Sequence, residues 1–199
     1  MIRSIRVYLL CAAFCACWAS RGFSQDADKA KPAVGPFRAD FLSQLDDVEK
    51  KVLDLADAVP ADKYGWRPEE GVRSISEVYV HIATANYSFP TFAGVKAPEG
   101  MMSDDNEKKI TDKKAVAEYV KKSFAYIRQV VQNMSDDDLA KPTKMFGQQT
   151  TYQNVYFTCA NHMHEHLGQS IAYARTNHVV PPWTAAEQAA AEKKKNAKN

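Results

Sequence analysis

Apolar residues recur at steps of three and four along four long segments of this chain, and this spacing limits the folds open to it. The first segment carries the clearest stripe, formed by Phe37, Phe41, Leu45, Val48, Val52 and Leu55. Such spacing places one apolar face along a helix and turns the charged residues to water. No segment shows strand-like alternation. Because four such helices bury their apolar faces against one another, the sequence predicts an all-α, antiparallel four-helix bundle.

Local signals mark where the first three helices begin or end. Val59-Pro60 ends the first helix, because the residue before a proline avoids helical backbone angles. Ser74, with Glu77 three residues later, matches a capping box that begins the second helix, and Pro90 disrupts or ends that helix. Thr111 is the expected cap of the third helix.

The remaining connections follow from composition. Ala93 to Glu107 is rich in Gly, Pro, Asp and Asn, so we expect a long loop there that borders the functional site. Ser135 to Asp138 is a short turn, and Lys141 to Thr150 is a connector. The fourth helix is expected from about Thr151 to Thr176, and Pro181-Pro182 prevents its continuation.

The N-terminus resembles a targeting segment. Residues 1–24 combine Arg3 and Arg6 with an apolar run from Val7 to Ala19, which is typical of a secretory signal peptide and too short to span a membrane. We expect cleavage after Ser24. A lipoprotein cleavage is disfavoured, since none of the three cysteines in this segment follows a Leu-small-small sequence.

Three further regions follow the signal peptide: a flexible lead-in at 25–36, the bundle at 37–183, and an Ala/Lys-rich tail at 184–199 in which we expect disorder from Lys193 onward. Cleavage leaves 23 basic and 24 acidic residues and Cys159 as the one cysteine, so no internal disulfide is expected. The basic residues are dispersed outside the tail, which argues against nucleic-acid binding. We expect a secreted or periplasmic protein without a stable membrane anchor.

The histidines carry the strongest functional signal. His162 and His166 are four residues apart, so they project from one face of the fourth helix as a metal-binding pair does. His164 is rotated by roughly 200° from His162. We therefore expect His164, and also His178, at the surface or around the site. The pair by itself is a modest signal, because core residues show the same spacing.

His81 strengthens the metal hypothesis. It lies within the apolar stripe of the second helix, where a lone histidine is usually a hydrogen-bonded core residue. A bundle, however, brings this face and the inner face of the fourth helix to one core. Three neutral imidazoles suit Zn²⁺, Ni²⁺ or Fe²⁺, with open positions left for water or substrate.

Other residues near the histidine pair are weaker candidates for a role in the site. Cys159 shares roughly the face of His162 and is either a fourth ligand, a reactive thiol or, as cysteine often is, a small buried hydrophobe. Glu165 is offset from the histidine face and should face solvent. Residues 162–166 have Met163 at the position where a zinc-protease HExxH motif has its glutamate, which argues against that chemistry. Asn86, Tyr87 and Gln169 lie within two turns of the ligands without an assigned catalytic role.

Two segments resemble the DinB (damage-inducible) superfamily. They are Tyr64-Gly-Trp-Arg-Pro to His81, at the entry to the second helix, and His162-x-x-x-His166-Leu-Gly-Gln-Ser-Ile-Ala-Tyr-Ala-Arg175, followed by Val179-Val180-Pro181-Pro182. The resemblance spans Phe37 to Trp183. It implies a four-helix bundle whose three histidines, here His81, His162 and His166, bind a divalent metal, frequently in a homodimer.

The family that these segments resemble includes thiol-dependent transferases and an isomerase that uses a low-molecular-weight thiol. The predicted signal peptide departs from these relatives, which act in the cytosol where the thiol is abundant. Three functions therefore remain open: a metal-dependent transferase or hydrolase with a small-molecule substrate, a non-catalytic metal or small-ligand binding protein, and a structural bundle with core histidines.

Overall fold

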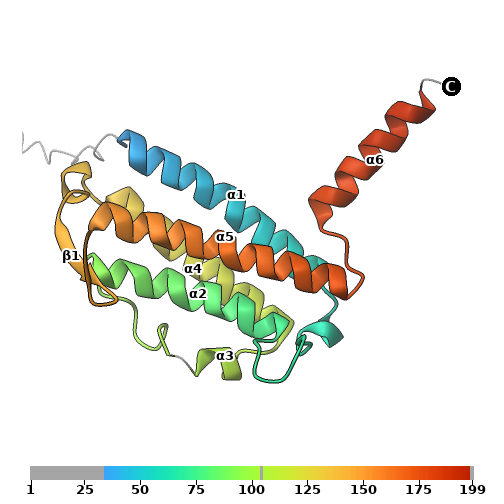
Figure 1. The fold of residues 1–199 in the computed structure, drawn as a ribbon, viewed down its shortest axis with the longest axis horizontal. Helices are drawn as coiled ribbons and strands as arrows, with labels where there is room; N and C mark the ends of the chain where they lie inside the picture. Colours follow the sequence, from blue (N-terminus) through green and yellow to red (C-terminus); the bar gives the residue numbers. More distant parts are fainter. Residues whose placement is uncertain (1–33, 104, 198–199) are drawn as a thin grey trace, which may run out of the picture. The chain divides into compact units, whose positions relative to one another are not determined.

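The computed structural model describes residues 34–103 and 105–197, and its bundle consists of four long helices. These helices are α1 (Pro36–Ala58), α2 (Ile75–Phe92), α4 (Lys113–Asn133) and α5 (Tyr152–Thr176). Both α1 and α2 lie against α4 and α5, so the four helices enclose one interior (Figure 1). The predicted all-α fold class is confirmed. The predicted signal peptide at 1–24 and most of the lead-in lie outside the described residues.

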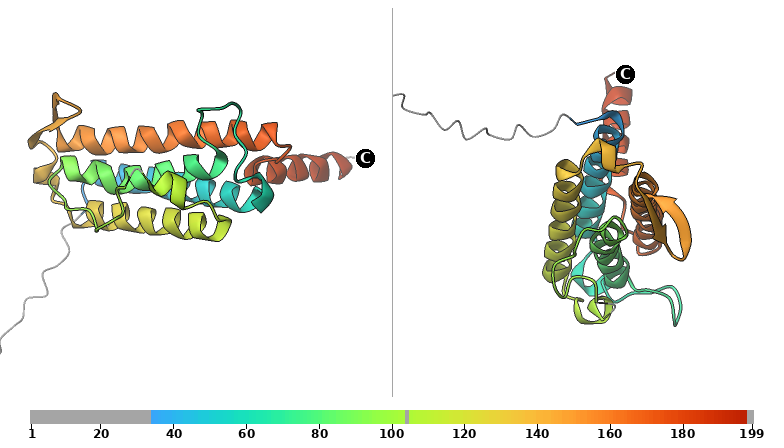
Figure 2. Two further views of the ribbon diagram at one scale, coloured as in Figure 1. Left: turned by 90° about the horizontal axis from the view of Figure 1, so that it is seen from below. Right: turned by 90° about the vertical axis from the view of Figure 1, so that its left-hand side faces the viewer.

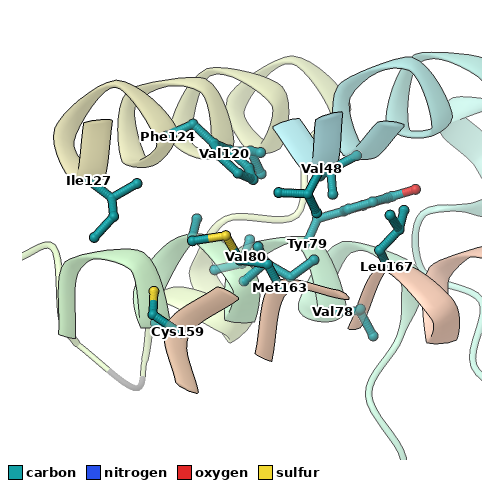
Figure 3. Close-up of a cluster of buried hydrophobic side chains, with 14 of the residues drawn as sticks. Val48, Val78, Tyr79, Val80, Val120, Phe124, Ile127, Cys159, Met163 and Leu167 are labelled. Atoms are coloured by element: carbon teal, nitrogen blue, oxygen red, sulfur yellow. The ribbon is translucent and has the colours of Figure 1, made fainter. Parts of the chain in front are cut away.

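The bundle interior is filled by the apolar stripes predicted from the sequence. Five of the six stripe residues of α1 are buried, and Phe37 is partly buried against the same cluster. Figure 3 shows how Val48 of α1, Val80 of α2, Phe124 of α4 and Met163 of α5 meet between the helices. Full burial of one such side chain contributes roughly 1.5–3 kcal/mol.

The direction of each helix follows from its side-chain contacts. Lys113, at the start of α4, bonds the Asp57 carbonyl oxygen at the end of α1, whereas Arg128, farther along α4, bonds Asp46 earlier in α1, so these two helices are antiparallel. Helices α2 and α5 are also antiparallel, as Figure 2 shows. Helices α2 and α4 instead run parallel, because Thr84 meets Tyr119 while Asn86 meets Ser123. Antiparallel pairing thus holds for two of the neighbouring pairs, and the long loop after α2 carries the chain back along the bundle before α4 begins (Figure 1).

The signals at the helix ends are mostly confirmed. The capping box is present, since Ser74 Oγ accepts from the Glu77 N–H at 3.3 Å and Glu77 Oε2 accepts from the Ser74 N–H at 2.7 Å. Two expectations need correction. Helix α2 continues two residues beyond Pro90, because a proline in the last turn removes only one hydrogen bond. Asp112, rather than Thr111, caps α4.

The connector before α5 contains two strands, whereas none is predicted from the sequence. Its residues form the antiparallel strands β1 (Pro142–Met145) and β2 (Gln148–Thr151). Phe146 and Gly147 form the two-residue turn, and both have positive φ angles, of 50° and 80°. A turn with two positive φ angles matches the twist of a hairpin. The strands are too short and too polar to show a periodic pattern.

Two 3₁₀ turns and two further α-helices complete the described chain. They are the 3₁₀ turns η1 (Ala61–Lys63) and η2 (Asp136–Asp138), helix α3 (Asn106–Lys109) and helix α6 (Pro182–Asn196). Helix α6 passes Lys193, where the sequence analysis expects disorder, because alanine and lysine are strong helix formers. Among the described residues, no helix combines the length and apolar content needed to cross a bilayer.

Glu77 joins the start of α2 to the loop that follows α2. Its buried carboxylate accepts hydrogen bonds from Lys108 Nζ of α3 at 2.6 Å and from Arg67 Nη2 at 3.2 Å. Burial by itself raises the pKa of Glu77. The hydrogen bonds from Lys108, the Ser74 N–H and Arg67 outweigh burial and lower the pKa to about 2.

We expect Glu77→Gln to lower the free energy of unfolding at neutral pH by about 2 kcal/mol, because glutamine keeps the cap but loses the charge. A carboxylate with a lowered pKa stabilises the fold above its unfolded-state value of 4.5, and this stabilisation is lost as the pH falls toward about 2. Urea unfolding at a series of pH values should show the variant and the wild type converging in acid. Glu118→Gln, on the exposed side of α4, is the control. A difference that stays constant with pH would contradict this role.

Candidate metal centre

The three histidines predicted as ligands come together in the structure. His81 projects from α2, and His162 and His166 project from successive turns of α5. One nitrogen from each ring lies within 4.8 Å of the other two. The ring centroids are 4.9 Å apart for His81 and His162, 4.6 Å for His81 and His166, and 4.4 Å for His162 and His166.

The local sequence explains why these side chains face one another at the edge of the core. Val78 and Ile82 flank His81 on α2 and are fully buried. Met163 and Leu167 follow the two histidines of α5 and are buried in the same cluster. Because these apolar residues pack in one core, the faces of α2 and α5 that carry the histidines lie next to each other. The histidines are half-buried, so a ligand can reach them.

Hydrogen bonds orient two of the rings. His81 Nδ1 lies 2.7 Å from Glu107 Oε1, and Glu107 Oε2 lies 2.7 Å from Arg73 Nε. His166 Nδ1 lies 2.8 Å from Gln169 Oε1. A carboxylate or amide oxygen can only accept, so the Nδ1 atoms of His81 and His166 carry the protons. Nε2 is then the nitrogen that each ring has left to bind a metal.

The donor set fits a transition-metal ion. His81 Nε2 and His162 Nε2 are 3.0 Å apart. Two imidazoles on one tetrahedral Zn²⁺, with Zn–N bonds of about 2.0–2.1 Å, have nitrogens about 3.3 Å apart. The other ring nitrogen of His162, Nδ1, is buried and has no hydrogen-bond partner within the part of the chain that the structure describes, so this ring is the one that no hydrogen bond at Nδ1 orients. The arrangement needs only a small adjustment of ring positions to hold an ion.

Burial keeps the rings of His81 and His162 uncharged. It lowers the pKa of His162 to about 3, and the neighbouring His166 and His81 add to the decrease. Burial also lowers the pKa of His81 by more than the hydrogen bond to Glu107 raises it. Both rings are therefore neutral at pH 7 and have lone pairs for a metal.

The other candidate residues are separated from this group. Cys159 is fully buried in the core, where burial raises the pKa of its thiol, and it does not join the three-histidine group (Figure 3). Glu165 is exposed, as predicted. His164 is half-buried beside Phe37 of α1. His178 is exposed just beyond α5, with a φ of 61°.

Gln169, Asn86 and Tyr87 differ in their distance from the site. Gln169 contacts His166 directly. Asn86 bonds Ser123 in the core, and Tyr87 stacks near Tyr119, so neither reaches the histidines in the described contacts.

Sequence reasoning missed Glu107 and Arg73 as partners of His81. The composition of residues 93–107 did indicate a segment that borders the site, and Glu107, its last residue, lies in helix α3 in the structure. No spacing rule connects Glu107 with His81, 26 residues earlier.

In metal-free protein, lowering the pH from about 7.5 to 5 should cost at most about 2 kcal/mol of stability through His162. The unfolded chain takes up a proton near the ordinary histidine pKa of 6.5, whereas buried His162 stays neutral down to about 3, so stability falls as the pH falls through this window. Urea unfolding in the presence of a chelator measures the loss. His162→Gln should reduce it, and His178→Asn, at an exposed position, should not. Equal pH dependence in all three proteins would argue against a desolvated His162.

Comparison with known proteins assigns this chain to a family. The DinB superfamily model matches residues 44–170. The uncharacterized protein YjoA of Bacillus subtilis (strain 168) is 29% identical over 126 residues, which cover 61% of this chain and 79% of that protein.

Two solved structures share the fold. The crystal structure of a DinB-like protein from Bacillus cereus ATCC 10987 superposes with a TM-score of 0.61 at 22% identity, covering 71% of this chain and 93% of that one. The crystal structure of the DinB-like YjoA from Bacillus subtilis gives a TM-score of 0.56 at 19% identity, covering 73% and 94%. The match of the family model over most of the bundle and the shared helical fold show that this chain belongs to the DinB superfamily.

Proposed function

We propose that His81, His162 and His166 bind one divalent metal ion, Zn²⁺, Ni²⁺ or Fe²⁺, and that the centre acts on a small molecule as a transferase or hydrolase. The observation that carries this proposal is the convergence of three imidazoles, with one nitrogen of each ring within 4.8 Å of the other two. Burial alone does not require such convergence, because core histidines are satisfied singly by hydrogen bonds.

Three protein ligands leave coordination positions open, which is the feature that separates catalytic from structural metal sites. A bound metal of this kind supplies a hydroxide or thiolate near neutral pH and polarises a carbonyl group. A thiol is one candidate co-substrate.

The chain itself contributes orientation. Arg73 holds Glu107, and Glu107 holds the ring of His81, so the direction of one ligand nitrogen is set before any metal arrives. Gln169 does the same for His166 and is in turn held by its hydrogen bond to Tyr173 at 3.0 Å. Ligands held in this way bind metal more tightly, because less freedom is lost on binding.

Export to the periplasm or cell exterior and assembly into a homodimer belong to the same proposal. Export rests on the sequence of residues 1–24, and the homodimer rests on the resemblance to the DinB superfamily. Export would deprive the protein of a cytosolic thiol and would favour water or another nucleophile. A non-catalytic binding protein is the alternative, and turnover of thiol or ester and amide substrates by the metal-loaded protein distinguishes the two.

Protein purified without a histidine tag should contain close to one Zn, Ni or Fe per chain, measured by elemental analysis. His162→Ala should lose most of this metal, because one of three ligand nitrogens is gone. His164→Ala is a matched control on the same helix, with its ring on the other side. A wild-type protein that holds no metal and takes up none when it is added would overturn the proposal.

Glu107→Gln should weaken metal binding by about 10–100-fold, because an amide orients His81 less firmly than a carboxylate and leaves it less basic. Competition with a chromophoric chelator measures the affinity. Glu165→Gln, adjacent to a ligand in sequence but exposed, should have no effect. Equal affinity in both variants would show that Glu107 does not support the site.

A further inference from the structure

A cavity of about 240 Å³ adjoins the histidines. His81 and His162 form part of its lining, and the side chains of Phe89, Phe92 and Phe146 form another part. Pockets for drug-sized ligands usually have volumes of roughly 300–1,000 Å³, so this cavity suits a smaller group. Its position next to two proposed ligands means that a molecule bound at the metal extends into it.

The aromatic part of the lining is continuous with the histidines. The ring of Phe89 contacts that of His162 in an edge-to-face arrangement with centroids 5.5 Å apart. Phe146 lies edge-on to Phe89 at 6.3 Å and to Phe92 at 5.1 Å. Rings placed in this way offer both faces and edges to a further aromatic ring.

Phe146 is unfavourable at its position in two respects, its exposure and its backbone conformation. Its side chain is 71% exposed, and its backbone has a φ of 50°, a conformation that residues other than glycine rarely adopt. The β1–β2 hairpin that carries it is fixed to the end of α2, because Thr143 Oγ1 donates to the Phe92 carbonyl oxygen at 2.6 Å. A large apolar side chain held exposed by a strained turn indicates a role in binding.

The charged groups at the cavity are already paired. Arg73 and Glu107 bond each other, and Glu107 also bonds His81. The remaining polar side chains in the lining, Thr84 and Ser88, are neutral. The lining residues therefore offer no unpaired charge to an ionic group. An apolar ring, in contrast, would be transferred from water into contact with the aromatic side chains of the lining.

We propose that this cavity binds a small aromatic group of the substrate, whose polar head reaches the metal, and that Phe146 closes the outer side of the cavity over it. This inference rests on the proposed metal site and adds the class of molecule that the site accepts. Phe146 acts here as a specificity-determining residue.

Two hydroxamates with the same metal-binding head test the inference. Benzohydroxamate carries a phenyl ring and acetohydroxamate a methyl group, and calorimetric titration of the zinc-loaded full chain measures both affinities. The wild type should bind benzohydroxamate at least about tenfold more tightly, because its ring leaves water. Phe146→Ala should reduce this ratio to about threefold or less with the metal content unchanged.

Phe157→Ala is the matched control. Phe157 is another exposed phenylalanine, at 55%, but it lies on α5 beside Phe37 of α1, in a cavity whose lining includes none of the three proposed ligands. This variant should keep the wild-type ratio. Equal affinities for the two hydroxamates in metal-loaded wild type, or the same ratio in wild type and Phe146→Ala, would overturn the aromatic pocket and leave the metal site standing.

Failure of the metal site is seen separately. If the wild type does not load zinc, saturation-transfer NMR of benzohydroxamate with the metal-free protein still reports on the cavity. Transfer to the phenyl protons that Phe146→Ala abolishes and Phe157→Ala retains would support the aromatic pocket. Absence of transfer to wild type would overturn it.

Discussion

The packing of α2 against α5 is the contact on which the rest of the site depends. Val78 and Ile82 of α2, together with Met163 and Leu167 of α5, are buried in one cluster. Because the two helices are antiparallel, this packing sets His81 opposite the turn that separates His162 from His166. The histidines need no separate force to meet, since the hydrophobic free energy that closes the bundle also brings their rings together.

Burial has a second consequence at the same place. It disfavours the charged form of an imidazole, so His81 and His162 stay neutral where an exposed histidine would be partly protonated. The desolvation that costs stability in acid is thus the condition that leaves nitrogen lone pairs for a metal. Fold and site draw on one physical effect, and a substitution that opens the core beside these rings would change both.

The connection between α2 and α4 contains α3, which supplies hydrogen-bond partners for residues of α2. Lys108 bonds Glu77 at the start of α2, and the adjacent Glu107 bonds Arg73 and His81. One short segment therefore secures the start of α2 and orients a proposed ligand. The solved relatives, at 22% and 19% identity, establish the shared fold, whereas the proposed chemistry rests on these contacts of the chain itself.

The sequence by itself determined the helices, the capping box at Ser74 and the faces that carry the three histidines, because each depends on residues three or four positions apart. Only the tertiary structure decided the parallel course of α2 and α4, the partnership of Glu107 with His81 and the place of Phe146 beside the cavity. Glu107 is 26 residues from His81, and Phe146 is 54 residues from Phe92. Contacts of this kind follow from how the chain returns upon itself, and no local period in the sequence encodes that return.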